Sequence, residues 1–270
     1  MTRANEIDYK LYGDDMQFVE IELDQGESVL AEAGAMMYMD HKIKMDTIFG
    51  DGSGKDKGKG LMGKIMGAGK RLVTGEGLFM TVFTNNQGGK AHISFGAPYP
   101  GSILAVDLNE MDGTIICQKD AFLCAAKGIS VGIYLQKKIG AGFFGGEGFI
   151  MQKLEGDGMV FLHAGGTMIK KQIMHGESLT IDTGCLVAMT SGIDFDVKFA
   201  GDIKSGLFGG EGIFLGTLSG QGEVWLQSLP FSRMADRIYK AAGGSKGETK
   251  HAANTGIGEL AGLTNLFGRD

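Results

Sequence analysis

Three glutamates, each placed between two glycines, are the residues whose type and spacing best suit chemistry. They are Glu76, Glu147 and Glu211; two large apolar residues follow each Gly-Glu-Gly motif, and the copies lie 71 and 64 residues apart. If three repeats pack around one axis, the carboxylates would converge there and could hold a hard divalent cation such as calcium or magnesium. Alternatively, each carboxylate accepts hydrogen bonds from backbone N–H groups of its own turn. We favour this structural role and keep the metal site as the alternative.

Two glycine-rich stretches imitate nucleotide-binding loops. Residues 140–145 match the GxGxxG fingerprint, but the apolar run after them predicts a strand instead of the helix whose N-terminus would hold a pyrophosphate. Residues 50–55 lack the spacing of a phosphate loop, and Asp56 stands where a magnesium-binding Ser or Thr belongs. We therefore expect no cofactor.

The five histidines and three cysteines form no recognisable metal or catalytic set. Aligning the repeats places Phe161 and Trp225 at the position of His92, and Ser94 and Gln227 at that of His163. The cysteines lie in apolar runs without CxxC spacing, which is typical of buried thiols in a reducing compartment. Since no nucleophile motif or acid–base carboxylate pair is recognisable either, we expect that the protein is not an enzyme.

Glycine turns and alternating apolar residues predict the elements that carry these side chains. Gly26, Gly113 and Gly176 each precede a small polar residue and a strand-like run, the signature of a hairpin turn. The 47 glycines and only three prolines indicate many tight turns, with no helical pattern between the strands. We predict an all-β fold for residues 1–231: three tandem β-sandwich repeats, similar to a double-stranded β-helix and packed with pseudo-threefold symmetry. The repeats span about residues 16–98, 102–167 and 168–230.

Two segments depart from the repeat pattern. Residues 47–74 form a basic Gly/Lys insertion, whose cations are Lys55, Lys57, Lys59, Lys64, Lys70 and Arg71. Such a segment could contact an anionic membrane or nucleic acid, although we favour a solvated loop whose short helix caps the sandwich. Residues 232–270 predict a short C-terminal helix with Ser232 as its N-cap, followed by a partly ordered tail.

Net charge and hydropathy limit which binding partners and which cellular location we expect. The formal net charge of −6 argues against sequence-specific nucleic-acid binding, which needs concentrated Lys and Arg. The N-terminus has no apolar signal region, and the sequence has no run of 18 uncharged apolar residues. We expect a cytoplasmic protein.

Three strings carry a family resemblance: residues 144–150, residues 176–188 and the run Gly-Glu-Val-Trp-Leu-Gln-Ser-Leu-Pro at 222–230. Over about residues 15–235 the chain resembles the bacterial branch of the altered-inheritance-of-mitochondria-24 family, a family of unknown function. The resemblance implies a triplicated double-stranded β-helix unit similar to the tryptophan RNA-binding attenuation protein. The bacterial members have no assigned activity, and the mitochondrial member is linked to inner-membrane organisation, so no catalytic residue carries over.

These observations favour a non-enzymatic structural or interaction scaffold of uncharacterised process. We expect a homo-oligomer, or a complex with an unknown protein partner, because the edge strands of such a scaffold need to be covered. One alternative is a protein that binds a small ligand or a divalent cation in a pocket between repeats. A further alternative is peripheral association with an anionic membrane or nucleic acid through residues 51–71.

Overall fold

The strands of the structure fall into three consecutive groups of six, which we call units 1, 2 and 3. A computed structural model describes residues 3–49, 79–134, 150–199 and 214–242. Unit 1 contains β2 (Phe18–Leu23), β3 (Ser28–Glu32), β4 (Met36–Met39), β5 (Ile43–Phe49), β6 (Phe79–Asn85) and β7 (Ala91–Gly96). Unit 2 contains β8 (Gly101–Asp107), β9 (Thr114–Gln118), β10 (Phe122–Ala126), β11 (Ser130–Tyr134), β12 (Met151–Glu155) and β13 (Met159–Gly165). Unit 3 contains β14 (Met168–Ile173), β15 (Ser178–Asp182), β16 (Leu186–Thr190), β17 (Ile193–Phe199), β18 (Phe214–Gly220) and β19 (Gly222–Gln227).

Short helical elements and one extra strand complete the fold. The strand β1 (Asp8–Tyr12) precedes unit 1, and a single α-helix, α3 (Phe231–Ala241), follows unit 3 in the described residues. The 3-10 turns are η1 (Leu108–Met111), η2 (Lys119–Ala121) and η4 (Thr183–Cys185). The predicted all-β fold with a short C-terminal helix is confirmed.

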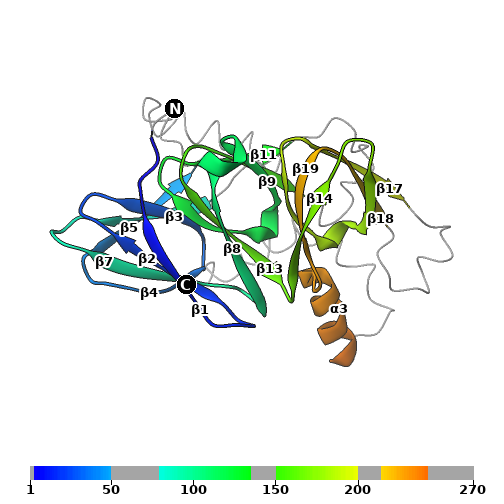
Figure 1. The fold of residues 1–270 in the computed structure, drawn as a ribbon. Helices are drawn as coiled ribbons and strands as arrows, with labels where there is room; N and C mark the ends of the chain where they lie inside the picture. The colour runs from blue at the N-terminus through cyan, green and yellow to red at the C-terminus, as the bar shows by residue number, and fades with distance from the viewer. Residues whose placement is uncertain (1–2, 50–78, 135–149, 200–213, 243–270) are drawn as a thin grey trace, which may run out of the picture.

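Each unit places three of its six strands in one sheet and three in another, and neighbouring units share a sheet. The N-terminal sheet has the order β1-β2-β7-β4, and the C-terminal sheet has the order β15-β18-β17. Between them lie a first shared sheet, β5-β6-β3-β10-β13-β8, and a second shared sheet, β11-β12-β9-β16-β19-β14. Figure 1 shows the three units side by side, from blue through green to orange. The shared sheets therefore join the units through main-chain hydrogen bonds.

The three glycines predicted to form hairpin turns lie in turns, but these turns are not hairpins, because the strands they connect lie in different sheets and do not pair with each other. Gly26, Gly113 and Gly176 have positive φ angles of 89°, 73° and 86°. Each follows the first strand of its unit and connects it to the second. Because an L side chain is strained at such angles, glycine fits these three turns.

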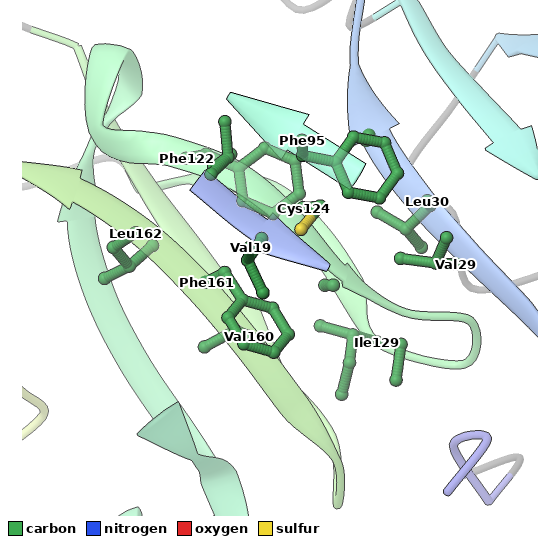
Figure 2. Close-up of a cluster of buried hydrophobic side chains, with 14 of the residues drawn as sticks. Val19, Val29, Leu30, Phe95, Phe122, Cys124, Ile129, Val160, Phe161 and Leu162 are labelled. Atoms are coloured by element: carbon green, nitrogen blue, oxygen red, sulfur yellow. The ribbon is translucent and has the colours of Figure 1, made fainter. Parts of the chain in front are cut away.

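The apolar core continues across the junction between units 1 and 2. Figure 2 shows Val19 and Phe95 of unit 1 close to Cys124 and Phe161 of unit 2, and all four side chains are fully buried. A smaller core cluster lies between the second shared sheet and the C-terminal sheet and includes Phe195 and Leu218. The units are therefore fastened by side-chain packing as well as by sheet pairing.

Two element boundaries differ from the sequence prediction. Strand β5 continues through Phe49, so the first positions of the predicted 47–74 insertion are strand. The helix α3 begins at Phe231 with Pro230 as its N-cap and no side-chain capping bond, so the predicted N-cap, Ser232, lies inside the helix. Pro230 can start the helix because its φ of −57° is already close to the helical value.

Candidate interaction surfaces

The sequence-predicted site residues lie outside the described part of the chain. This applies to the proposed metal ligands Glu76, Glu147 and Glu211, and to the basic residues Lys55, Lys57, Lys59, Lys64, Lys70 and Arg71. Most of the 47–74 insertion and the tail after residue 242 also lie outside it. Within the described residues, no group of three or more His, Cys, Asp or Glu side chains is placed to hold a metal ion. No helix among them is long and apolar enough to cross a membrane.

The junctions between units follow one rule. The third strand of each later unit pairs antiparallel with the second strand of the unit before it: β10 with β3, and β16 with β9. In the first junction Cys124 lies opposite Ala31, and in the second Ala188 lies opposite Cys117. The same kind of contact is therefore made twice within one chain.

At the two ends of the row of units, the strands equivalent to those that form the junctions have no partner strand on their outer side in the described residues. Strand β4 is the third strand of unit 1 and lies at the end of the N-terminal sheet, while β15 is the second strand of unit 3 and lies at the end of the C-terminal sheet. Neither strand has a neighbour on its outer side in the described ranges. Such an edge offers a row of free main-chain N–H and C=O groups to another strand.

Strand β4 also exposes large apolar side chains. Met36, Met37 and Tyr38 are 37%, 53% and 46% exposed. The Tyr38 hydroxyl donates to Glu20 Oε2 at 2.5 Å, and this hydrogen bond raises the pKa of the tyrosine. Exposed methionines beside an open strand edge are typical of a surface that another protein covers.

Strand β15 is fixed at one end by the C-terminal helix. Asp182 accepts a hydrogen bond from Gly184 N at 2.9 Å and forms an ion pair with Arg233 at 3.0 Å. Along the strand, Ile181 is buried and Leu179 is half-buried. The edge is therefore apolar on the side that faces the sandwich and is held in place.

A groove of about 380 Å³ lies between units 2 and 3. Its walls are Leu104–Asp107 of β8, Glu110 and Met111 of η1, Met168 and Lys170 of β14, and Trp225 of β19. Trp225 is buried, and the Lys170 ammonium lies 6.0 Å from the centre of its ring and forms an ion pair with Glu223 at 2.9 Å. The groove is thus mainly apolar with two carboxylates at its rim.

The corresponding surface at the junction of units 1 and 2 is covered by β1. This strand pairs antiparallel with β2, and the Tyr9 ring meets the Phe161 ring edge-on at 4.9 Å. Phe161 is fully buried there. The sequence analysis missed β1, although the alternation of polar and apolar residues from Asp8 to Tyr12 could have indicated it.

The strand register corrects one equivalence drawn from the sequence. A β-bulge occurs at the same place in β4, β10 and β16, and the pairs that follow it are Tyr38–Ser94, Cys124–Phe161 and Ala188–Trp225. Ser94, and not His92, is therefore the counterpart of Phe161 and Trp225. The position of His163 and Gln227 is filled by Gly96 in unit 1. A slip of two residues leaves every side chain on its predicted face, so the sequence pattern could not reveal it.

His163 is buried and has no catalytic access. It is 1% exposed, and neither ring nitrogen has a hydrogen-bond partner in the described part of the chain. The Tyr99 ring packs edge-on against it at 4.4 Å and in turn contacts Phe231 of α3 at 5.3 Å. Desolvation lowers the pKa of His163 to about 4, and the Tyr99 main chain, which makes no hydrogen bond of normal geometry to the ring, acts in the opposite direction. The imidazole is neutral at physiological pH.

Two thiols are inaccessible because they are buried, and the surface carboxylate Glu22 already has partners. Cys117 and Cys124 are fully buried, and desolvation raises the pKa of both, so neither thiol is an accessible nucleophile. On the N-terminal sheet, Glu22 forms an ion pair with Lys90 and a hydrogen bond with His92 Nε2 at 3.2 Å, and the Lys90 hydrogen bond lowers the pKa of Glu22. Among the residues that the structure describes, the open strand edges and the groove are therefore the surfaces proposed for binding.

Three comparisons relate the chain to known proteins. A family model described as mitochondrial biogenesis AIM24 matches residues 9–229. The chain is 32% identical over 231 residues to an uncharacterised protein of Streptococcus pyogenes serotype M6, a match that covers 83% of this chain and 87% of the relative. It is also similar to the crystal structure of a protein from Streptococcus pyogenes, with 26% identity and a TM-score of 0.69. That match covers 87% of this chain and all of the solved chain.

Proposed function

The chain belongs to the AIM24 family, and its streptococcal relative is an uncharacterised protein. From the structure of the chain's strand edges we propose that it is a non-enzymatic scaffold that assembles head to tail. Strand β15 of one copy pairs with β4 of the next. Each chain then continues the array of its neighbour, as units 1, 2 and 3 continue one another. The family membership confirms the resemblance carried by the sequence motifs, and it assigns no activity.

The observation that supports this proposal is the repeated junction. Strands β3 and β9 bind the third strand of the following unit, and β15 is their counterpart in unit 3. Strands β10 and β16 accept that pairing, and β4 is their counterpart in unit 1. Because the two free edges are complementary to each other and differ in structure, the contact is heterologous. Such a contact produces a ring or a filament.

The internal junctions define the register of this contact. By equivalence with Cys124–Ala31 and Ala188–Cys117, Tyr38 of one copy lies opposite Ile181 of the next. Met39 then lies opposite Thr180. A tyrosine opposite a β-branched residue is a favourable cross-strand pair, and the contact covers the exposed methionines of β4.

A proline in β15 tests the proposal. In the first junction Lys127 N donates to Ser28 O at 3.0 Å, so the alternate pair Ala125–Leu30 is also a hydrogen-bonded pair. Thr180 is the counterpart of Leu30, and its N–H therefore points outward, away from β18. Thr180→Pro removes this donor while leaving the pairing with β18 in place.

Light scattering gives the result directly. We expect the wild type and the matched control Thr180→Val to have a mass that is a multiple of the 28.6 kDa chain. Thr180→Pro should shift the mass to that of a single chain, with an unchanged far-ultraviolet circular dichroism spectrum. If the proline variant kept the wild-type mass, β15 would not be the joining edge.

A further inference from the structure

The three first strands of the units differ in what lies beside them. Strand β2 is covered by β1, whereas β8 and β14 end the two shared sheets. The start of β8 is bridged to Met16 at Gly101, but no strand lies beside Leu104–Asp107 in the described residues. The groove between units 2 and 3 runs along β8, at the place that β1 occupies one junction earlier. One chain thus contains a filled version of this binding position and a second version that is open along Leu104–Asp107.

The first residues of β8 show which of its main-chain groups point toward the outer edge of the strand. Ile103 N donates to Gln17 Oε1 at 2.7 Å and Gly101 N donates to Asp15 O at 2.6 Å, so these residues direct their N–H groups away from β13. Hydrogen-bonding direction alternates along an antiparallel strand, and Ala105 therefore presents its N–H and C=O in the same outward direction. No hydrogen-bond partner for either group is found in the part of the chain that is described. Ala105 is the counterpart of Glu20, which lies opposite Lys10 of β1.

The groove also contains the counterpart of the β1 aromatic contact. Tyr9 lies opposite Ile21 and packs against Phe161. In the open groove, Val106 is the counterpart of Ile21, and Trp225 is that of Phe161. A strand placed on β8 would direct the side chain opposite Val106 onto the wall formed by Trp225.

The charges at the rim of the groove indicate the charge of the segment that would bind there. Asp107 and Glu110 are the carboxylates of the groove, and its single lysine, Lys170, is already paired with Glu223. A residue opposite Asp107 would correspond to Asp8 of β1, which lies opposite Glu22. A basic side chain in that place complements the rim, whereas an acidic one is repelled.

We propose that this groove binds an extended peptide segment of a partner protein. The segment adds an antiparallel strand to β8, places an aromatic side chain against Trp225 and directs a basic side chain toward Asp107 and Glu110. This site uses β8 and not β4 or β15, so it does not depend on head-to-tail assembly.

The single tryptophan of the chain makes the binding measurable. The probe is a capped peptide that copies Ile7–Leu11 with the change Asp8→Lys, titrated into the full-length protein while Trp225 fluorescence is recorded. It stops before the position of Tyr12, because the corresponding Ile103 N–H already donates to Gln17. We expect a saturable change in emission. A peptide that also carries Tyr9→Ser should bind about tenfold more weakly, because it lacks the aromatic contact.

A matched pair of protein variants locates the site. Ala105→Pro removes the outward N–H and should weaken binding about tenfold, whereas Ala105→Ser keeps this donor and should bind as the wild type does. Equal affinity in both variants, or no emission change with any peptide, would overturn the proposal. It would also be overturned if Ala105→Pro reduced the mass of the assembly in light scattering, since a second copy would then occupy β8.

Discussion

Replacing His163 tests whether the buried site around this side chain excludes a charge. The folded chain holds the pKa of this imidazole at about 4, below its ordinary value of 6.5, because the ring is buried without hydrogen-bond partners in the described residues. As the pH falls below 6.5, His163 is protonated in the unfolded chain but stays neutral in the folded chain. The resulting stability is complete above that pH and is lost progressively as the pH falls toward 4.

The pKa difference between the folded and unfolded chain sets how much unfolding free energy is lost in acid. The wild type should lose about 2 kcal/mol of unfolding free energy between pH 7 and pH 5, and about 3 kcal/mol by pH 4, from this group alone. His163→Leu removes the titration and the unpartnered ring nitrogens, so it should be at least as stable at pH 7 and clearly more stable at pH 5. His163→Gln is a second control, since Gln227 occupies the equivalent position of unit 3.

Urea unfolding followed by circular dichroism measures the difference between wild type and variant at each pH. Carboxylates titrate in both proteins, so their contribution cancels in this difference. The reasoning would be refuted if the difference stayed constant from pH 7 to pH 4, or if it favoured the wild type in acid.

Two further substitutions probe the packing by urea unfolding. Asn85 is buried, and its side chain makes three hydrogen bonds to main-chain groups, so Asn85→Ala should cost about 2 to 4 kcal/mol; a loss below about 0.5 kcal/mol would mean that water replaces these bonds. In Gly165→Ala the new methyl carbon would lie 2.1 Å from the Leu229 carbonyl oxygen, and we expect a loss of about 2 kcal/mol. The matched control is Gly132→Ala, where the nearest atom lies 4.0 Å away; equal effects of the two alanines would contradict the argument.

The sequence pattern predicted the elements better than their partners. Turn glycines such as Gly26 and the alternation of apolar residues are local signals, and they were sufficient for an all-β fold with a final helix. Pairing between β3 and β10 is not local, because Cys124 and Ala31 are far apart in sequence and each strand is apolar on both faces. A strand buried on both faces has no alternation to indicate its neighbour.

The surfaces proposed for binding escaped the sequence for a related reason. A free edge such as β4 is defined by the absence of a neighbouring strand, which only the topology reveals. Likewise, the sequence around Trp225 is that of an ordinary core strand. Its place in a groove depends on β8 of the preceding unit, which the sequence does not reveal. The metal site predicted at Glu76, Glu147 and Glu211 stays a prediction, because these residues lie outside the described part of the chain.

Disulfide trapping between two copies tests the head-to-tail contact most directly. One chain carries Tyr38→Cys and the other Ile181→Cys, both with Cys185→Ser, because this third thiol is only partly buried. Cysteine suits both positions, since Cys124 and Cys117 occupy them in the internal junctions, where burial raises the pKa of their own thiols and keeps them unreactive. In the predicted register the two positions form a non-hydrogen-bonded pair with Cα atoms about 4.5 Å apart, within the reach of a disulfide.

Mixing the two variants under mild oxidation should give a covalent dimer on a non-reducing gel. The control pair, Met36→Cys with Ile181→Cys, keeps an exposed cysteine on β4 but lies out of register and should give little product. A high yield from the first pair alone is the result that head-to-tail pairing of β15 with β4 predicts. No dimer, or equal yields from both pairs, would contradict it.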